Sequence, residues 1–199
     1  MAIVSRGFTG RGRSIGPELP PGQYLTTDFP VLSAGPTPRV RTESWQLTIR
    51  TETGQSSTLD WAALTALPGE DITADLHCVT KWSKLGTAWR GVSLDTLLGE
   101  VDTAADYALI GCYGGYTTNL PTQDLLDGQA WVAYRYDGED IPPEHGGPAR
   151  LLVPHLYLWK SAKWLRSIEL SDEDTPGFWE SVGYHTYGDP WREQRYWGD

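Results

Sequence analysis

The feature that most constrains the fold is a succession of short strand-like and helix-like segments, separated by turns rich in glycine and proline. Residues 45–50 alternate apolar and polar as a half-buried strand does, and 72–79 and 107–112 also have the character of strands. Asp60 and Ser93 each precede a short helical stretch that a proline or a glycine ends. Because strands and helices follow in no strict alternation, the sequence predicts an α+β domain with mixed sheets and short helices.

The rest of the chain fits the same class. Further strands are predicted at 131–136, 150–153 and 164–170, and a short helix at 120–126. Residues 1 to about 42 are rich in glycine and proline and show neither periodicity, so we expect an irregular segment that wraps around the domain. A chain of 199 residues with 39% hydrophobic content can bury one good core, which predicts a single domain over 1–199.

Charge and cysteine content exclude several classes of partner. Sixteen basic and 26 acidic residues give a net charge of -10, which would repel nucleic acid and anionic membranes. Two cysteines, Cys78 and Cys112, cannot form a disulfide framework. The sequence has neither an export signal nor an apolar run of membrane-spanning length. We therefore expect a cytoplasmic protein with no nucleic-acid or membrane partner.

Cys78 is the first candidate for chemistry. It stands at the end of the strand predicted over 72–79, between His77 and the cation of Lys81. Positive charge nearby lowers the pKa of a thiol, and the thiolate is the form that attacks electrophiles or binds a soft metal. A lone cysteine can equally be a small buried apolar residue. The local sequence leaves both interpretations open.

A second candidate is a basic cluster in the last third of the chain. It begins with His145-Gly-Gly-Pro-Ala-Arg150 and continues with Lys160-Ser161-Ala-Lys163. Glycines let backbone amides approach an anion, a guanidinium binds its oxygens in pairs, and a lysine adds a point charge. The cluster therefore predicts a phosphate site, with a solvated strand end as the alternative.

Taken together, the motifs resemble a known family. The runs that carry the resemblance are Cys78–Trp82, Tyr113–Tyr116, Ala133–Gly138, His145–Arg150 and Lys163–Leu165. In this order and spacing they resemble the molybdopterin-binding domain of the sulfite oxidase family, and above all its small bacterial branch related to the catalytic subunit of the methionine sulfoxide reductase MsrP. The resemblance covers almost the whole chain. It implies a sulfite oxidase-type fold and a cofactor of molybdenum and molybdopterin.

The resemblance also implies roles for single residues. Cys78 matches the family's cysteine that binds molybdenum, in agreement with the preference of soft metals for thiolates. His145 and Arg150 match positions that hold the pterin and its terminal phosphate, Lys163 completes the anion site, and Tyr184 matches an active-site tyrosine. The other predicted cofactor contacts are Thr26, Thr27, Asp28, His77, Lys81, Trp82, Gly115, Thr117, Lys160 and Ser161.

Departures from the family pattern shape the expected function. Thr26–Asp28 stand where sulfite oxidases carry Arg-Asn-His, and Lys81-Trp82 replace paired arginines. The cationic side chains that bind sulfite in that family are therefore expected to be missing here. We expect oxygen-atom transfer on a small-molecule substrate such as a sulfoxide or an N-oxide. The chain shows neither a haem domain nor the sandwich through which sulfite oxidases dimerise, so we expect a monomer that uses an external electron donor or acceptor. The predicted pocket walls are Trp82, Trp89, Tyr113 and Tyr116.

Two other functions remain as alternatives. A non-catalytic molybdopterin-binding or carrier module would keep the fold, although it has no need of a metal-binding thiolate at Cys78. A zinc hydrolase would lack the closely spaced ligand pairs that zinc sites show. Its candidate ligands would be Cys78, His77, His145, His155 and His185.

Overall fold

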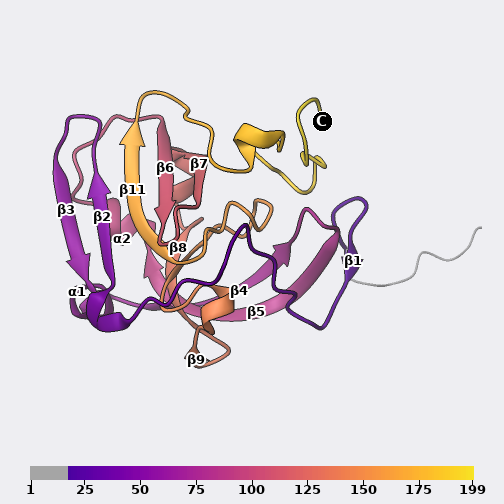
Figure 1. Ribbon diagram of the computed structural model, residues 1–199, viewed down its shortest axis with the longest axis horizontal. Coiled ribbons are helices and arrows are strands. Elements are labelled where there is room, and N and C mark those ends of the chain that lie inside the picture. Colours follow the sequence, from indigo (N-terminus) through magenta and orange to yellow (C-terminus); the bar gives the residue numbers. More distant parts are fainter. Residues whose placement is uncertain (1–17) are drawn as a thin grey trace, which may run out of the picture.

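The computed structural model describes residues 18–199 and confirms an α+β fold built on two mixed sheets (Figure 1). Residues 1–17 of the predicted irregular segment lie outside the described residues. The first sheet has the strand order β1-β5-β8-β10, with β4 paired to β5 and β9 to β8, and the second has the order β3-β2-β11-β6-β7. The first sheet comprises β1 (Tyr24–Leu25), β4 (Glu70–His77), β5 (Trp82–Ser93), β8 (Trp131–Tyr136), β9 (Glu139–Asp140) and β10 (Arg150–Leu152). The second comprises β2 (Gln46–Arg50), β3 (Ser56–Asp60), β6 (Tyr107–Cys112), β7 (Thr117–Pro121) and β11 (Leu165–Ser171).

The helices are few and short. In α1 (Trp61–Ala66) the Asp60 side chain accepts a hydrogen bond from the Ala63 amide at 2.8 Å, and in α2 (Leu94–Leu98) Ser93 caps in the same way. Both caps were predicted, because such side chains satisfy amides that a helix start leaves free. The remaining turns are 3-10 helices at Thr42–Ser44, Thr122–Leu125, Pro143–His145 and Glu180–Val182. No helix within 18–199 has the length and apolar character needed to cross a bilayer.

Strands with a clear apolar pattern were predicted, and strands rich in polar residues were not. Leu47 and Ile49 of β2 are buried in alternation, as expected. The longest strand, β5, was missed because Ser83, Lys84 and Gly86 interrupt its pattern. The helix predicted over 120–126 is wrong for its first residues, which end β7, and only a 3-10 turn follows.

Two buried clusters divide the core. The larger draws on both sheets and includes Leu47, Ile110, Val132 and Leu151. The smaller lies on the other face of β8 and β10, because successive side chains of a strand point to opposite faces, and it includes Leu152 and Cys78. The β4–β5 hairpin therefore carries Cys78 to the face of the first sheet that lies away from the larger core.

The N-terminal segment crosses the molecule beside this face. After the two residues of β1, which pair in parallel with β5, residues 26–41 contain neither helix nor strand. In Figure 1 this indigo to purple trace runs from β1 on one side of the molecule to the start of β2 on the other. All of its residues from Phe29 to Pro38 except Val31 line the cavity described next.

Candidate active site

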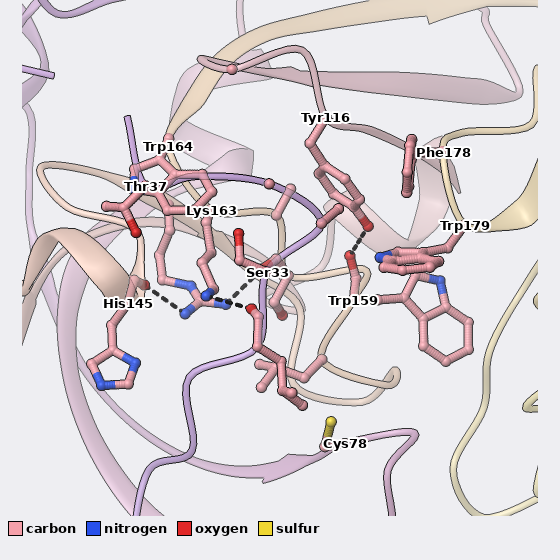
Figure 2. A pocket seen from close by; sticks show the side chains of 18 of the residues that line it. Ser33, Thr37, Cys78, Tyr116, His145, Trp159, Lys163, Trp164, Phe178 and Trp179 are labelled. Carbon is pink, nitrogen blue, oxygen red and sulfur yellow. Dashed lines mark hydrogen bonds between the residues drawn. The ribbon is translucent and has the colours of Figure 1, made fainter. Parts of the chain in front are cut away.

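The candidate site is a cavity of about 480 Å³ whose walls come from segments far apart in the sequence. Most of these segments are loops or strand ends, which a rigid pair of sheets holds in place. Figure 2 shows Cys78 below, a cluster of cationic and polar side chains to one side and aromatic rings to the other. The lining residues fall within 29–38, 78–82, 113–116, 145–150, 158–164 and 178–184.

Cys78 is the first residue after β4 and begins the tight turn into β5. Its amide donates to the Trp82 carbonyl at 2.9 Å, and Lys81 closes the turn with a positive φ of 78°. The side chain is 6% exposed and lines the cavity, and its Sγ accepts a hydrogen bond from the Thr80 hydroxyl at 3.1 Å. The turn thus presents one sulfur atom to the cavity.

The predicted source of positive charge around Cys78 is wrong. The His77 ring pairs with the Ser83 hydroxyl at 2.8 Å, and burial lowers its pKa, which favours the neutral form. Lys81 is exposed, and it is not among the residues that line the cavity. Burial raises the pKa of the Cys78 thiol, opposed by the Thr80 hydrogen bonds and more weakly by the charges of Arg195 and Lys163. The nearby cations therefore come from distant parts of the chain.

Arg150 and Lys163 form a pair of cations at the cavity without a carboxylate partner. Within 18–199 neither forms an ion pair, and residues 1–17 contain no Asp or Glu. Arg150 is 1% exposed and donates to the carbonyls of His145 and Ser161 at 2.8 and 2.6 Å. Lys163 donates to the Leu32 and Glu144 carbonyls, both at 2.8 Å.

The electrostatics of this pair favour an anionic ligand. Burial lowers the pKa of Arg150 to about 10. Burial, and then the charge of Arg150, lower the pKa of Lys163 to about 8. Buried charges are costly unless they are paired. Buried Arg150 and half-buried Lys163 donate only to carbonyls within the described part of the chain, so they are suited to bind a phosphate. Gly146 lets the Lys163 side chain lie close to the backbone of the 145–150 loop, because a Cβ at position 146 would lie 2.9 Å from the Cβ of Lys163.

Two buried polar atoms at the cavity also lack partners within the described chain, His145 Nδ1 and Trp82 Nε1. The His145 ring stacks on Phe29 with centroids 4.0 Å apart, which leaves its edge for a ligand. Burial, followed by the charges of Arg150 and Lys163, lowers the pKa of His145. Because buried polar atoms are nearly always hydrogen-bonded, these two fit a heterocycle with donors and acceptors, as a pterin is.

The opposite wall is aromatic. Tyr184 borders the cavity in edge-to-face contact with Trp159, with centroids 5.2 Å apart, and stacks on Trp179 at 5.0 Å. Two hydrogen bonds fix Trp159. Its carbonyl accepts from the Tyr116 hydroxyl at 2.8 Å (Figure 2), and its indole donates to Glu180 at 2.9 Å. Trp159, Trp179 and Phe178 were not predicted, although ten tryptophans in the chain were a signal that rings line a site.

The structure brings half of the other predicted site residues to the cavity together with Cys78. Cys78, Trp82, Gly115, His145, Arg150, Ser161, Lys163 and Tyr184 all line the cavity. Of the predicted walls, Tyr113 and Tyr116 line it, whereas Trp89 is buried behind Phe29 and Arg150.

Other predicted contacts point elsewhere. Lys160 is fully buried, and its ammonium binds Glu180 at 2.6 Å and the carbonyls of Asn119 and Thr186. These contacts occupy the side chain away from the cavity. Seven of the predicted contacts do not line the cavity: Thr26, Thr27, Asp28, His77, Lys81, Thr117 and Lys160.

The zinc-hydrolase alternative finds no support in this arrangement. Within 18–199, no three His, Cys, Asp or Glu side chains gather in a way that could hold a metal ion. His155 instead lies 3.4 Å from Asp124, and His185 accepts hydrogen bonds from the Tyr187 and Gly188 amides.

Comparison with known proteins agrees with the chemistry of the cavity. Residues 34–179 match the family described as the oxidoreductase molybdopterin binding domain. The chain belongs to this family: it is a molybdopterin-dependent oxidoreductase of the sulfite oxidase type, with molybdenum and molybdopterin as its cofactor. This confirms the predicted family, fold and cofactor, and favours an enzyme over a carrier module.

Individual relatives place the chain within the family. It is 42% identical over 181 residues to the uncharacterized oxidoreductase YuiH of Bacillus subtilis, a match that covers 89% of this chain and 91% of YuiH. It is 32% identical over 127 residues to the putative protein-methionine-sulfoxide reductase subunit YedZ1 of Azospira oryzae, covering 63% of this chain and 48% of that protein.

The fold is shared with a solved structure, the sulfane dehydrogenase SoxCD from Paracoccus pantotrophus. The TM-score is 0.63 at 19% identity, over 70% of this chain and 41% of that chain. At this identity the likeness shows the fold alone.

Proposed function

We propose that the protein transfers an oxygen atom to or from a small neutral substrate, such as a sulfoxide or an N-oxide, with Cys78 as the protein ligand of molybdenum. The observation that carries this proposal is the division of the cavity into a thiol, a pair of cations of which Arg150 is buried and Lys163 half-buried, and an aromatic wall. The name of one relative, a methionine-sulfoxide reductase subunit, supports this choice of substrate.

The residues present fit the cofactor. Cys78 Sγ would bind the metal, Arg150 and Lys163 the terminal phosphate, and His145 Nδ1 and Trp82 Nε1 the polar edge of the pterin. The molybdenum cofactor supplies two-electron oxidation and reduction, and the protein orients it and excludes water. Metal binding would also remove the proton that burial favours on Cys78, because a coordinating thiol is deprotonated.

The preference for a neutral substrate follows from which charges face the cavity. Its only lysine and arginine within 18–199 are Arg150 and Lys163, and no Asp or Glu of that range lines it. Once these cations hold the cofactor phosphate, no further lysine or arginine among the described lining residues is left for a dianion such as sulfite. Asp28 adds no repulsion of its own inside the cavity, because it is exposed and is not among the lining residues.

Tyr184 is the residue best placed to move a proton. Burial, and next the charges of Tyr196 and Cys78, raise the pKa of its hydroxyl, so the group stays protonated. It lines the cavity, and its ring packs against the cluster that contains Cys78. Its hydroxyl would donate a hydrogen bond to the substrate oxygen and assist the departure of that oxygen as water.

The test compares two reactions on one molybdenum-loaded sample. With a reduced dye as donor, we expect turnover of dimethyl sulfoxide or trimethylamine N-oxide, and weak or no oxidation of sulfite. Cys78→Ser should reduce turnover to background with the fold intact, and Tyr184→Phe should lower kcat by about 10²-fold, as loss of proton transfer does. Efficient sulfite oxidation at low substrate concentration, or full activity of Cys78→Ser, would contradict the proposal.

A further inference from the structure

The wall around Tyr184 continues as an unbroken set of rings to the molecular surface. Tyr184 lies between Trp159, which borders the cavity, and Tyr196, whose centroid is 5.5 Å from that of Tyr184. The backbones of Tyr184 and Tyr196 also pair in an antiparallel bridge. One ring contact therefore separates the cavity wall from the C-terminal segment.

The surface end of this set is apolar and exposed. Tyr196 is 51% and Trp197 67% exposed, and the Trp197 amide donates to the Gly183 carbonyl at 3.0 Å, which brings exposed Val182 alongside. We call these three residues, Val182, Tyr196 and Trp197, the entry patch. Adjacent large apolar side chains on a surface commonly mark an interaction site.

We propose that the entry patch is where a one-electron redox protein docks, and that electrons pass from it through Tyr196 and Tyr184 to the cofactor. This inference rests on the proposed function. Reduction of one sulfoxide to its thioether consumes two electrons and two protons, breaks the sulfur–oxygen bond and releases the oxygen as one water. Two donor molecules, or one donor in two encounters, would each be oxidised by one electron, while the solvent supplies the protons.

The negative charge of the protein indicates that its partner has a positively charged docking surface. The chain carries a net charge of -10, and the exposed Asp199 lies close to the patch in the sequence. On the same segment Glu193 pairs with Arg195 at 3.9 Å and Arg192 is exposed, so the acidic character rests on Asp199 and on the net charge of the chain. The Asp199 carboxylate accepts hydrogen bonds from the Arg195 and Tyr196 amides, which holds that negative charge beside the Tyr196 backbone. The partner that fits is a redox protein with a basic rim around an apolar edge of its prosthetic group, because complementary charge speeds and orients encounter.

The experiment uses the holoenzyme adsorbed on a gold electrode coated with an amine-terminated monolayer, which serves as the basic surface. Without substrate, voltammetry gives the interfacial electron-transfer rate and the midpoint potential of the bound metal. We expect Tyr196→Leu to lower that rate by about tenfold or more, equivalent to about 1.4 kcal/mol of barrier, at unchanged midpoint potential and molybdenum content. Tyr196→Phe keeps the ring contact and should restore most of the rate.

Trp191 provides the matched control. It is 47% exposed on the same segment, but its ring faces His77 and not Tyr184. Trp191→Leu should keep the wild-type rate, whereas Trp197→Ser should slow transfer from the amine-coated electrode and leave sulfoxide turnover driven by methyl viologen unchanged. Equal rates in wild type and Tyr196→Leu, or an equal loss in Trp191→Leu, would overturn the proposal. Since no substrate is present at the electrode, failure of the proposed reaction would be seen separately.

Discussion

Two largely buried cationic regions lie close together in the sequence and differ in their hydrogen-bond acceptors. Lys160 is paired with the Glu180 carboxylate, which also accepts from Thr118 and Trp159. Within 18–199, Arg150 and Lys163 donate hydrogen bonds only to carbonyls. A buried cation with its own carboxylate is satisfied by the fold, whereas one without it is arranged for a ligand. Lys160 is therefore a structural lysine, whereas Lys163, three positions later, is free of a carboxylate within the described residues, as the proposed phosphate site requires.

The strongest way to break this comparison is to remove the counter-ion from the structural region. Glu180→Gln leaves the Lys160 ammonium buried and unpaired, which should cost about 3–5 kcal/mol of the free energy of unfolding. Urea unfolding measures it. Asp71→Asn, which breaks the exposed Arg90–Asp71 pair, is the matched control and should cost about 0–1 kcal/mol. Similar losses in both variants would show that the buried pair is not special.

The binding region should respond in affinity for the cofactor. Lys163→Met and Arg150→Ala each remove a charge-assisted contact to the phosphate, so each should weaken cofactor binding by about 1.5–3 kcal/mol. Arg150→Lys should recover only part of this, because an ammonium cannot reproduce a two-pronged contact. Pterin fluorescence and molybdenum analysis measure occupancy. Full occupancy in both variants would mean that these cations do not form the phosphate site.

The two cysteines extend the comparison to thiols. Cys112 lies at the end of β6 in the larger core, is not among the cavity-lining residues, and has its pKa raised by burial to about 12. Cys112→Ala should therefore cost about 1 kcal/mol of stability through lost packing and keep the cofactor. Thermal unfolding and metal analysis check both points. Loss of molybdenum in this variant would contradict the assignment of metal binding to Cys78 alone.

The last prediction concerns the pH dependence of the stability of the apoprotein. The pKa of Lys163 is about 8 in the fold against an ordinary 10.5, so the unfolded chain binds more protons between these values. Stability should then rise as pH increases from about 8 towards 10.5, and Lys163→Met should lack this rise. Denaturant unfolding of both proteins between about pH 8 and pH 10.5 measures this change in the free energy of unfolding. The same slope in both proteins would assign the titration to another group.

Local signals in the sequence predicted what depends on local contacts. The caps at Asp60 and Ser93 and the alternation of β2 were found because each depends on neighbours a few residues away. The strand β5 was missed, because its polar residues form a strand only through pairing with β4 and β8, which the local sequence does not reveal.

The site divides in the same way. Motifs identified Cys78 and the Arg150 region, but no local pattern distinguishes Lys160 from Lys163, because the deciding carboxylate is Glu180. The aromatic wall was missed for a related reason. Trp159 faces the cavity because Tyr116 and Glu180, both distant in sequence, hold it there.

The segment 29–38 has a consequence for how the enzyme is assembled. It forms one side of the cavity without belonging to either sheet, and its Leu32 carbonyl accepts a hydrogen bond from Lys163. An ammonium has three donors, and the Leu32 and Glu144 carbonyls take two of them, so one remains for a ligand. If Lys163 binds the phosphate as proposed, a single ammonium would join the segment and the cofactor, and loading of the cofactor would also fix the segment in place.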